Sequence, residues 1–345
     1  MRSRYHTIVL VTILLFLLQS CSSEHKPHAS FYYWKSTFRL SKTDSSYLAQ
    51  LQVKQINVKF FDVDWNFEAG KALPVAEIRF TEQVPNELSI IPTIFITNRT
   101  MVQIPVSQVS DLATKITTKI RSIADSNHLS IKEIQLDCDW SGKSREKFFL
   151  LASLVKKNIS RQSIQLSATI RLHQLKYIGR AGIPPVDKGI LMFYNMGSLD
   201  GRGTDNSILD LNIARQYLRR LKDYPLPLDI ALPIYQWVVL QREGQVINLL
   251  TNVSVEALHD TLHFKPITQK KFRVRESHYF HSLYLYRGDE LRLEEISLSQ
   301  LQESADLLNP IVNQSEPHIL FYYLDEKNLT RYAPEDLQKV VNHFR

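Results

Sequence analysis

Two aspartates close a short apolar segment, residues 134–140, which reads Ile-Gln-Leu-Asp-Cys-Asp-Trp. Side chains alternate between the two faces of a strand, so Asp137 and Asp139 are predicted to point to the same side. Neighbouring carboxylates repel each other and lose hydration, so folding alone rarely favours such a pair. The pair therefore predicts a functional site in which carboxylates bind a polar ligand or act on it.

The other predicted strands also end in carboxylates, amides and aromatic rings. Carboxylates and amides bind sugar hydroxyls and aromatic faces stack on sugar rings, so a mixed cleft of this kind is typical of a small-ligand site. Two carboxylates on different strands are also the minimum for cleavage of a glycosidic bond. We predict Asp139, Asp137 and Asp62 as catalytic candidates, and as substrate-binding candidates Trp34, Asp64, Trp65, Trp140, Arg171, His173, Tyr194, Asn195, Gln236, Trp237 and Asp325.

Several of these residues have a structural interpretation that competes with the functional one. Asp62 and Asp64 are suited to capping a helix or binding loop amides. Arg171 either contacts a ligand or neutralises the aspartates from the neighbouring strand, and His173 is either a base or a hydrogen-bonded structural residue. The four tryptophans can all belong to the core, although their positions at strand ends favour at least one in the cleft.

Metal binding is a further alternative, because the aspartates and His173 form an oxygen-rich group that suits a divalent cation. The sequence has no H-E-x-x-H, EF-hand loop, P-loop or G-x-S-x-G motif. We therefore predict no metal and no cofactor. The densest basic run, residues 270–275, indicates a solvated strand face more than a phosphate-binding patch, and nothing resembles a nucleic-acid-binding module.

The elements that must hold these residues alternate between strands and helices. Helical spacing of apolar residues predicts helices over 106–125, 144–158, 208–221, 297–308 and 334–344. Such alternation predicts a parallel sheet, and eight strand–helix units predict an α/β, (β/α)₈ TIM-type barrel. The eight strands, mostly continuous apolar runs, are predicted at 31–34, 56–65, 88–97, 131–140, 163–173, 189–195, 228–237 and 318–324.

One region departs from this repeat. Residues 271–296 read as a hairpin, with one strand over 272–286, a turn at 287–289 and a second strand over 291–296. Together with the following helix it predicts a hairpin and helix insertion, about 262–312, between strands seven and eight. The alternative is a small C-terminal β domain that takes up the last strand. Because no long linker is present, we predict one barrel domain over 31–345.

The N-terminus precedes the fold. Two arginines, a short apolar run over 8–18 and the sequence Leu-Gln-Ser-Cys at 18–21 predict a signal peptide over residues 1–20. The cysteine at the end resembles a bacterial lipobox, which implies lipidation of Cys21; an ordinary signal peptide or a single anchor helix is the alternative. Removal of residues 1–20 would lower the formal net charge from +7 to +5. We predict a tether over 21–30 and attachment to a bacterial membrane, the outer membrane being favoured.

Four segments together resemble a family of bacterial lipoproteins with a barrel domain, a family that carries over no activity. They are residues 31–34 (Phe-Tyr-Tyr-Trp), 134–140, 166–171 (Leu-Ser-Ala-Thr-Ile-Arg) and 191–195 (Leu-Met-Phe-Tyr-Asn). More distantly, the order of motifs is similar to chitinase-type glycoside hydrolases, which have a D-x-D-x-E signature after strand four and Met-x-Tyr-Asp on strand six. Here Ser141 stands in place of the catalytic glutamate and Asn195 in place of the last aspartate.

These observations lead to three hypotheses. The first is a lipid-anchored glycoside-hydrolase-like barrel in which Asp139 donates the proton, Asp137 raises its pKa by repulsion, and Asp62 or Asp325 is the second carboxylate. The second is a carbohydrate-binding barrel without catalysis, which Ser141 and Asn195 favour. The third is an assembly lipoprotein that uses residues 271–296 as a partner surface. Whether the chain is an enzyme stays open, and we expect it to act as a monomer.

Overall fold

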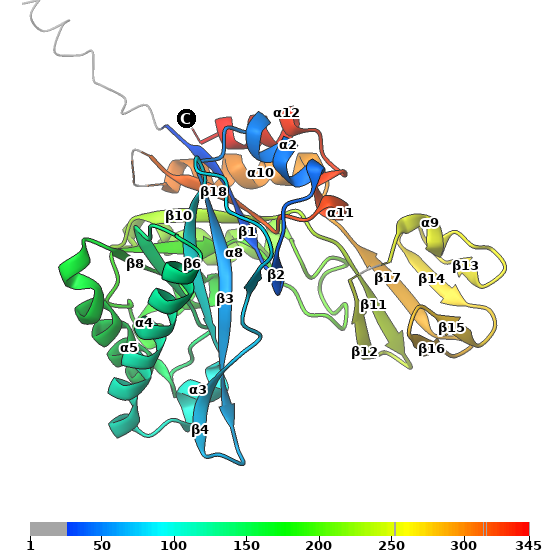
Figure 1. Cartoon of the computed structure of the whole chain (residues 1–345). Helices are drawn as coiled ribbons and strands as arrows, with labels where there is room; N and C mark the ends of the chain where they lie inside the picture. The colour runs from blue at the N-terminus through cyan, green and yellow to red at the C-terminus, as the bar shows by residue number, and fades with distance from the viewer. Residues whose placement is uncertain (1–25, 252, 313, 315, 345) are drawn as a thin grey trace, which may run out of the picture.

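The computed structural model describes residues 26–251, 253–312, 314 and 316–344. The predicted signal peptide, Cys21 and residues 21–25 of the predicted tether lie outside the described residues. Eight parallel strands form a closed barrel, because β1 pairs in parallel with both β18 and β3. The predicted (β/α)₈ barrel is therefore confirmed, and Figure 1 shows its helices around the strands. The barrel strands are β1 (His28–Tyr33), β3 (Gln55–Asn66), β6 (Ser89–Ile96), β7 (Glu133–Asp137), β8 (Gln165–Arg171), β9 (Lys188–Met192), β10 (Leu228–Pro233) and β18 (His318–Tyr322).

The helices that cover the barrel bury one apolar face each. In α4 the buried positions include Val109, Leu112, Ile116 and Ile120, which recur at the spacing of one helical face. All residues of β7 and β10 are buried, as expected for strands covered on both sides. The helices are α2 (Lys42–Gln50), α3 (Asn98–Gln103), α4 (Val109–Ser126), α5 (Arg145–Ile159), α6 (Leu172–Lys176), α7 (Ile178–Ala181), α8 (Leu211–Tyr217), α10 (Leu298–Leu308), α11 (Glu326–Leu329) and α12 (Pro334–Asn342).

The insertion lies between β10 and β18 as predicted, but it is larger than a hairpin. It forms a five-stranded antiparallel sheet, in the order β12-β11-β17-β14-β13, with its own buried apolar cluster. Figure 1 shows this sheet beside the barrel. Its elements are β11 (Trp237–Arg242), β12 (Gln245–Leu250), α9 (Val255–Leu258), β13 (Phe264–Pro266), β14 (Lys271–Val274), β15 (His278–Phe280), β16 (Leu283–Leu285) and β17 (Glu290–Glu294).

Two predicted boundaries in this region are wrong. The seventh barrel strand ends at Pro233, not at residue 237, and the insertion begins with β11 at Trp237, before residue 262. The predicted strand over 272–286 is three strands, because β14 ends after Val274 and β15 and β16 pair with each other as a separate hairpin. Gly244, which adopts φ +76, closes the turn between β11 and β12 and was the signal for the missed hairpin.

The two ends of the barrel carry different structures. β3 extends past the barrel and pairs with β4 (Lys71–Val75), which forms an antiparallel ribbon at the C-terminal end of the strands. Figure 1 shows this ribbon and α3 at one end of the barrel, whereas β1 begins at the other end, near α10 and α12. The chain therefore enters the barrel on the face opposite to the one where the strand-end residues gather.

Candidate functional site

A cavity of about 450 Å³ opens at the C-terminal ends of β6 to β9. Five of the residues that we predicted from their positions at strand ends line it: Asp139, Arg171, His173, Tyr194 and Asn195. Sequence reasoning missed the remaining members. These are Phe95, Leu172, Met196 and Tyr217. Three are apolar and the tyrosine lies on a helix, so none of them appeared as a polar residue at a strand end.

The two aspartates at the end of β7, Asp137 and Asp139, lie in different surroundings. Asp137 is 3% exposed; its Oδ1 accepts hydrogen bonds from Thr169 Oγ1 at 2.6 Å and from Arg171 Nη2 at 2.9 Å. The side chain of Asp139 is 56% exposed, and its Oδ1 lies 3.3 Å from His173 Nε2. Cys138 between them is buried. Asp137 therefore holds Arg171 in place, while Asp139 is open to a ligand.

The pKa of Asp139 lies below its ordinary value. Burial favours the neutral carboxyl, but the hydrogen bond and charge of His173, followed by the charge of Arg171, outweigh it. The prediction that Asp137 raises this pKa is wrong: His173 and Arg171 lower it, and together they outweigh the effect of burial. Asp139 is thus a carboxylate at neutral pH, which suits it to accept hydrogen bonds or protons.

Arg171 binds Asp137 and also lines the cavity. Its pKa is raised: burial disfavours the charge, but the negative charges of Asp137 and Asp139 favour it more strongly. The guanidinium meets Asp137 through one nitrogen, and its side chain lines the cavity. A guanidinium carries five N–H donors, so most of them remain for other partners. Both roles that the sequence left open for Arg171 are therefore compatible with its position.

Tyr194, which lines this cavity, packs with two further tyrosines. The Tyr194 ring stacks on Tyr322 with 5.2 Å between centroids, and Tyr235 packs edge-on against Tyr322 at 5.7 Å. Burial raises the pKa of Tyr194 and Tyr235 well above the ordinary value, so both are neutral phenols. Tyr235 Oη donates to Asn195 Oδ1 at 2.5 Å. That bond fixes the Asn195 amide and leaves its NH₂ group as a donor for a ligand.

His173 reaches the cavity by a different route from the predicted one. β8 ends at Arg171, and His173 lies in α6, so strand alternation does not align the two side chains. Residue 171 precedes α6 as its N-cap, and its backbone N–H donates to the side chain of Gln174 at 2.8 Å. The tight turn from strand to helix brings both side chains to the same cavity.

The other predicted carboxylates lie away from this cavity and have local partners. Asp62 pairs with Lys59 at 3.0 Å, and Asp64 pairs with Arg99 and accepts from Thr97 at 2.8 Å. Asp325 caps α11 and lies 3.0 Å from Lys35 Nζ.

The tryptophans and Gln236 are also placed outside the cavity. Trp140 is buried, stacks on Phe148 and donates to Ala181 O at 2.9 Å. Trp237 donates from its indole to Glu294 at 2.7 Å, and Gln236 lines a separate cavity of about 370 Å³ beside α11. Trp34 and Trp65 are partly buried against the barrel core.

Neither metals nor membrane spans are indicated within the described ranges. No group of three or more His, Cys, Asp or Glu side chains there is arranged to hold a metal ion. In the same residues, no helix combines the length and the apolar character that crossing a membrane requires.

The fold is similar to those of solved spore cortex-lytic enzymes and chitinases. The spore cortex-lytic enzyme SleL of Bacillus cereus is 14% identical with a TM-score of 0.54, over 93% of this chain and 75% of that chain. The GH18 chitinase ChiB of Flavobacterium johnsoniae is 11% identical with a TM-score of 0.55, over 92% and 94%. A mutant of the Ostrinia furnacalis Group II chitinase catalytic domain 2, in complex with penta-N-acetylchitooctaose, (NAG)5, is 11% identical with a TM-score of 0.53, over 94% and 96%.

No protein-family model and no curated protein matches the chain. At these identities the likeness shows the fold, which is a TIM barrel. The resemblance to chitinase-type barrels is thus confirmed at the level of the fold, and the lipoprotein family stays a prediction.

Proposed function

We propose that this barrel binds carbohydrate in the cavity at the C-terminal ends of β6 to β9. One observation carries the proposal: the cavity brings Asp139, Arg171, His173 and Asn195 together with the Tyr194 and Tyr217 rings. Carboxylate, amide and guanidinium groups match sugar hydroxyls, and the rings offer faces for stacking. The shared fold supports this choice, because one solved relative holds an oligosaccharide, (NAG)5.

We favour binding without hydrolysis. Asp139 is the one carboxylate among the described residues that line the cavity, whereas glycoside hydrolysis ordinarily uses two. The lowered pKa of Asp139 also removes it as a proton donor at neutral pH. Ser141, at the position of the chitinase glutamate, is engaged locally: its backbone N–H donates to Ser144 Oγ at 2.9 Å.

Titration calorimetry with (NAG)5 and with soluble peptidoglycan fragments tests the proposal. We expect saturable binding and no shortened products by mass spectrometry. Asp139→Asn should weaken binding about 10-fold or more, since a hydrogen bond to a charged group contributes about 1.5–3 kcal/mol. The control is Asp111→Asn, which removes an exposed carboxylate on α4 that pairs with Lys115 and should leave the Kd unchanged.

Two outcomes would change the assignment. Absence of binding to every saccharide in the panel would remove the carbohydrate hypothesis and leave the assembly hypothesis. Release of products by the wild type, lost in Asp139→Asn and kept in Asp111→Asn, would identify a glycoside hydrolase instead.

We also infer that the chain is tethered to a bacterial membrane, with the outer membrane favoured, through a lipid on Cys21. The basis is the lipobox-like sequence at residues 18–21. Because β1 begins on the barrel face opposite to the cavity, such a tether would leave the cavity facing away from the membrane. Cys21→Ser should move the full-length protein from the detergent phase to the aqueous phase in a partition assay; an unchanged distribution would contradict the lipid anchor.

A further inference from the structure

The loop that follows β9, residues 195–208, supplies two residues to the cavity and is folded back on itself. The backbone N–H of Asn195 donates to Ile208 O at 2.7 Å, and those of Met196 and Gly197 donate to Ser207 O at 3.1 Å. Asn195 adopts φ +55, a left-handed conformation that Asn tolerates better than most residues. The position of Ser207 therefore determines where the cavity residues Asn195 and Met196 lie.

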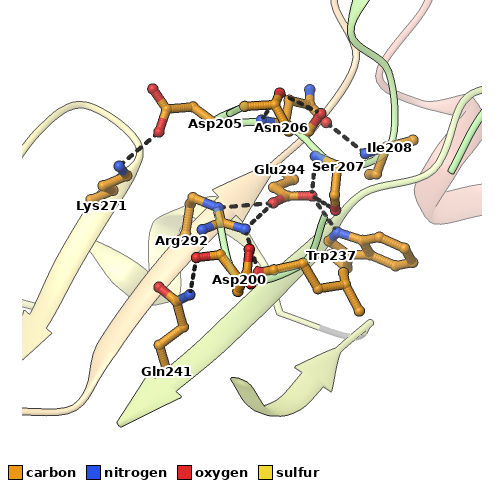
Figure 2. A network of polar contacts seen from close by, with 12 residues as sticks. Asp200, Asp205, Asn206, Ser207, Ile208, Trp237, Gln241, Lys271, Arg292 and Glu294 are labelled. Carbon is orange, nitrogen blue, oxygen red and sulfur yellow. Dashed lines mark hydrogen bonds and ion pairs between the residues drawn. The ribbon is translucent and has the colours of Figure 1, made fainter. Parts of the chain in front are cut away.

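Ser207 is held by a carboxylate of the insertion sheet. Glu294 in β17 is fully buried, and its Oε2 accepts from Ser207 N at 2.9 Å, Ser207 Oγ at 2.5 Å and Trp237 Nε1 at 2.7 Å. Its Oε1 accepts from Arg292 Nε at 2.8 Å and Arg292 Nη2 at 2.6 Å. Figure 2 shows Glu294 between Arg292, Ser207 and Trp237.

Further contacts join the same loop to the insertion. Arg292 Nη2 also donates to Leu199 O at 2.8 Å, and Gln241 Nε2 donates to Asp200 O at 3.0 Å. At the edge of this interface, the exposed Asp205 pairs with Lys271 at 2.7 Å (Figure 2). The loop and the insertion sheet thus meet through hydrogen bonds to backbone carbonyls and through buried charged side chains.

We propose that Glu294 is a positioning residue for the carbohydrate cavity: through Ser207 it fixes the loop that presents Asn195 and Met196. The inference rests on the proposed function, and it assigns to the insertion a part in ligand affinity. Among the described residues, no hydrogen bond or ion pair joins Glu294 to a residue that lines the cavity, and its hydrogen bonds to the loop are those to Ser207.

The hydrogen bonds around Glu294 explain why Ser207 is held in one position. A buried carboxylate is stable only when its lone pairs and charge are matched. Here five hydrogen bonds from three residues satisfy both oxygens of Glu294. A shift of Ser207 would break two of these bonds and leave the charge under-solvated. The loop is therefore pre-organised before a ligand arrives, which reduces the entropy lost on binding.

Glu294→Gln tests this role at almost constant volume. The amide has one oxygen for two sets of donors, so its NH₂ group must face either Arg292 or the Ser207 and Trp237 donors. Two readouts are needed: the Kd for (NAG)5, and the NMR resonances of the Asn195 and Met196 backbone amides without ligand. We expect the resonances of both amides to shift. The Kd should rise about 10-fold, which corresponds to the free energy of one hydrogen bond to a charged group.

Asp205→Asn is the matched control, because it removes a carboxylate that joins the same loop to the same sheet. Its side chain is 83% exposed, so the pair contributes little. Neither the two amides nor the Kd should change. If Glu294→Gln does not fold, Ser207→Ala is the second variant: it removes only the hydroxyl bond to Glu294 and should produce smaller changes in the same direction.

The outcomes separate this inference from the proposed function. Unmoved amides, or an unchanged Kd in a variant of a wild type that binds (NAG)5, would overturn the positioning role of Glu294. If the wild type binds no saccharide but the two amides shift in Glu294→Gln, the loop is positioned by Glu294 and the carbohydrate assignment is what fails.

Discussion

Asp229 in β10 gives a quantitative test of how charges buried in the barrel stabilise it. Its carboxyl is buried, with Lys188 Nζ 2.7 Å from Oδ2 and His318 Nδ1 3.8 Å from Oδ1. The same Lys188 ammonium lies 2.9 Å from Glu133. Burial raises the pKa of Asp229, but hydrogen bonds and charges from His318 and Lys188 outweigh burial and lower this pKa to about 2.

The magnitude follows from the two pKa values. A carboxyl whose pKa falls from 3.8 to about 2 on folding stabilises the native state by about 2.5 kcal/mol. Because the folded pKa is the lower one, this contribution is complete well above pH 4 and is lost as the pH falls toward 2. At pH 3 about half of it, ~1.3 kcal/mol, remains.

We therefore expect Asp229→Asn to cost about 1 kcal/mol more of the free energy of unfolding at pH 5.5 than at pH 3. Urea denaturation of wild type and variant at both pH values measures this difference, and losses that do not depend on pH cancel. Asp111→Asn, which affects an exposed pair on α4, should change stability by less than about 0.5 kcal/mol at either pH. An equal loss in Asp229→Asn at both pH values would refute the assignment of the stabilisation to the ionised carboxyl.

Two further substitutions test packing around the site by urea unfolding. Gly201 adopts φ +78, and a Cβ there would collide with the Arg292 guanidinium. Gly201→Ala should therefore lower the free energy of unfolding by about 1–3 kcal/mol. An unchanged urea midpoint would mean that residue 201 is not in contact with the insertion. Trp140→Phe keeps a ring against Phe148 but leaves Ala181 O without its donor, which should cost about 1–3 kcal/mol; a loss below about 0.5 kcal/mol would show that water replaces the indole.

The barrel was predictable because each of its strands is buried on both sides and each long helix shows one apolar face. The insertion was harder to read, since β12 is largely exposed and β15 and β16 are three residues each, too short for a clear alternation. Gly244 was the available signal for the first hairpin of the insertion. Short, half-exposed strands are specified by their pairing partners, which a linear pattern does not reveal.

Selecting polar residues at strand ends identified the candidate cavity, but it also selected aspartates that form ion pairs elsewhere on the barrel. Asp62, Asp64 and Asp325 stand at strand ends like Asp139, and each has a cation beside it, from Lys59, Arg99 and Lys35 respectively. Two of these cations, Arg99 and Lys35, come from other segments of the chain than the aspartate they meet, so spacing along the chain does not show the pairing. This selection identifies the face of the barrel, and the side-chain partners decide which residues on that face remain free for a ligand.

The aspartate pair after β7 shows how one motif divides into two roles. Folding was expected to disfavour two nearby carboxylates, and the structure offsets that cost by giving each its own partner, Arg171 for Asp137 and His173 for Asp139. Asp137 is the last residue of β7, so its side chain stays beside Arg171 of the neighbouring strand. Asp139 lies beyond the ladder, where the chain has left the sheet, and meets His173 on α6. The His173 side chain is 52% exposed and the Arg171 side chain 21% exposed. A ligand can displace the more exposed partner more readily, and this difference makes Asp139, rather than Asp137, the residue that a saccharide would contact.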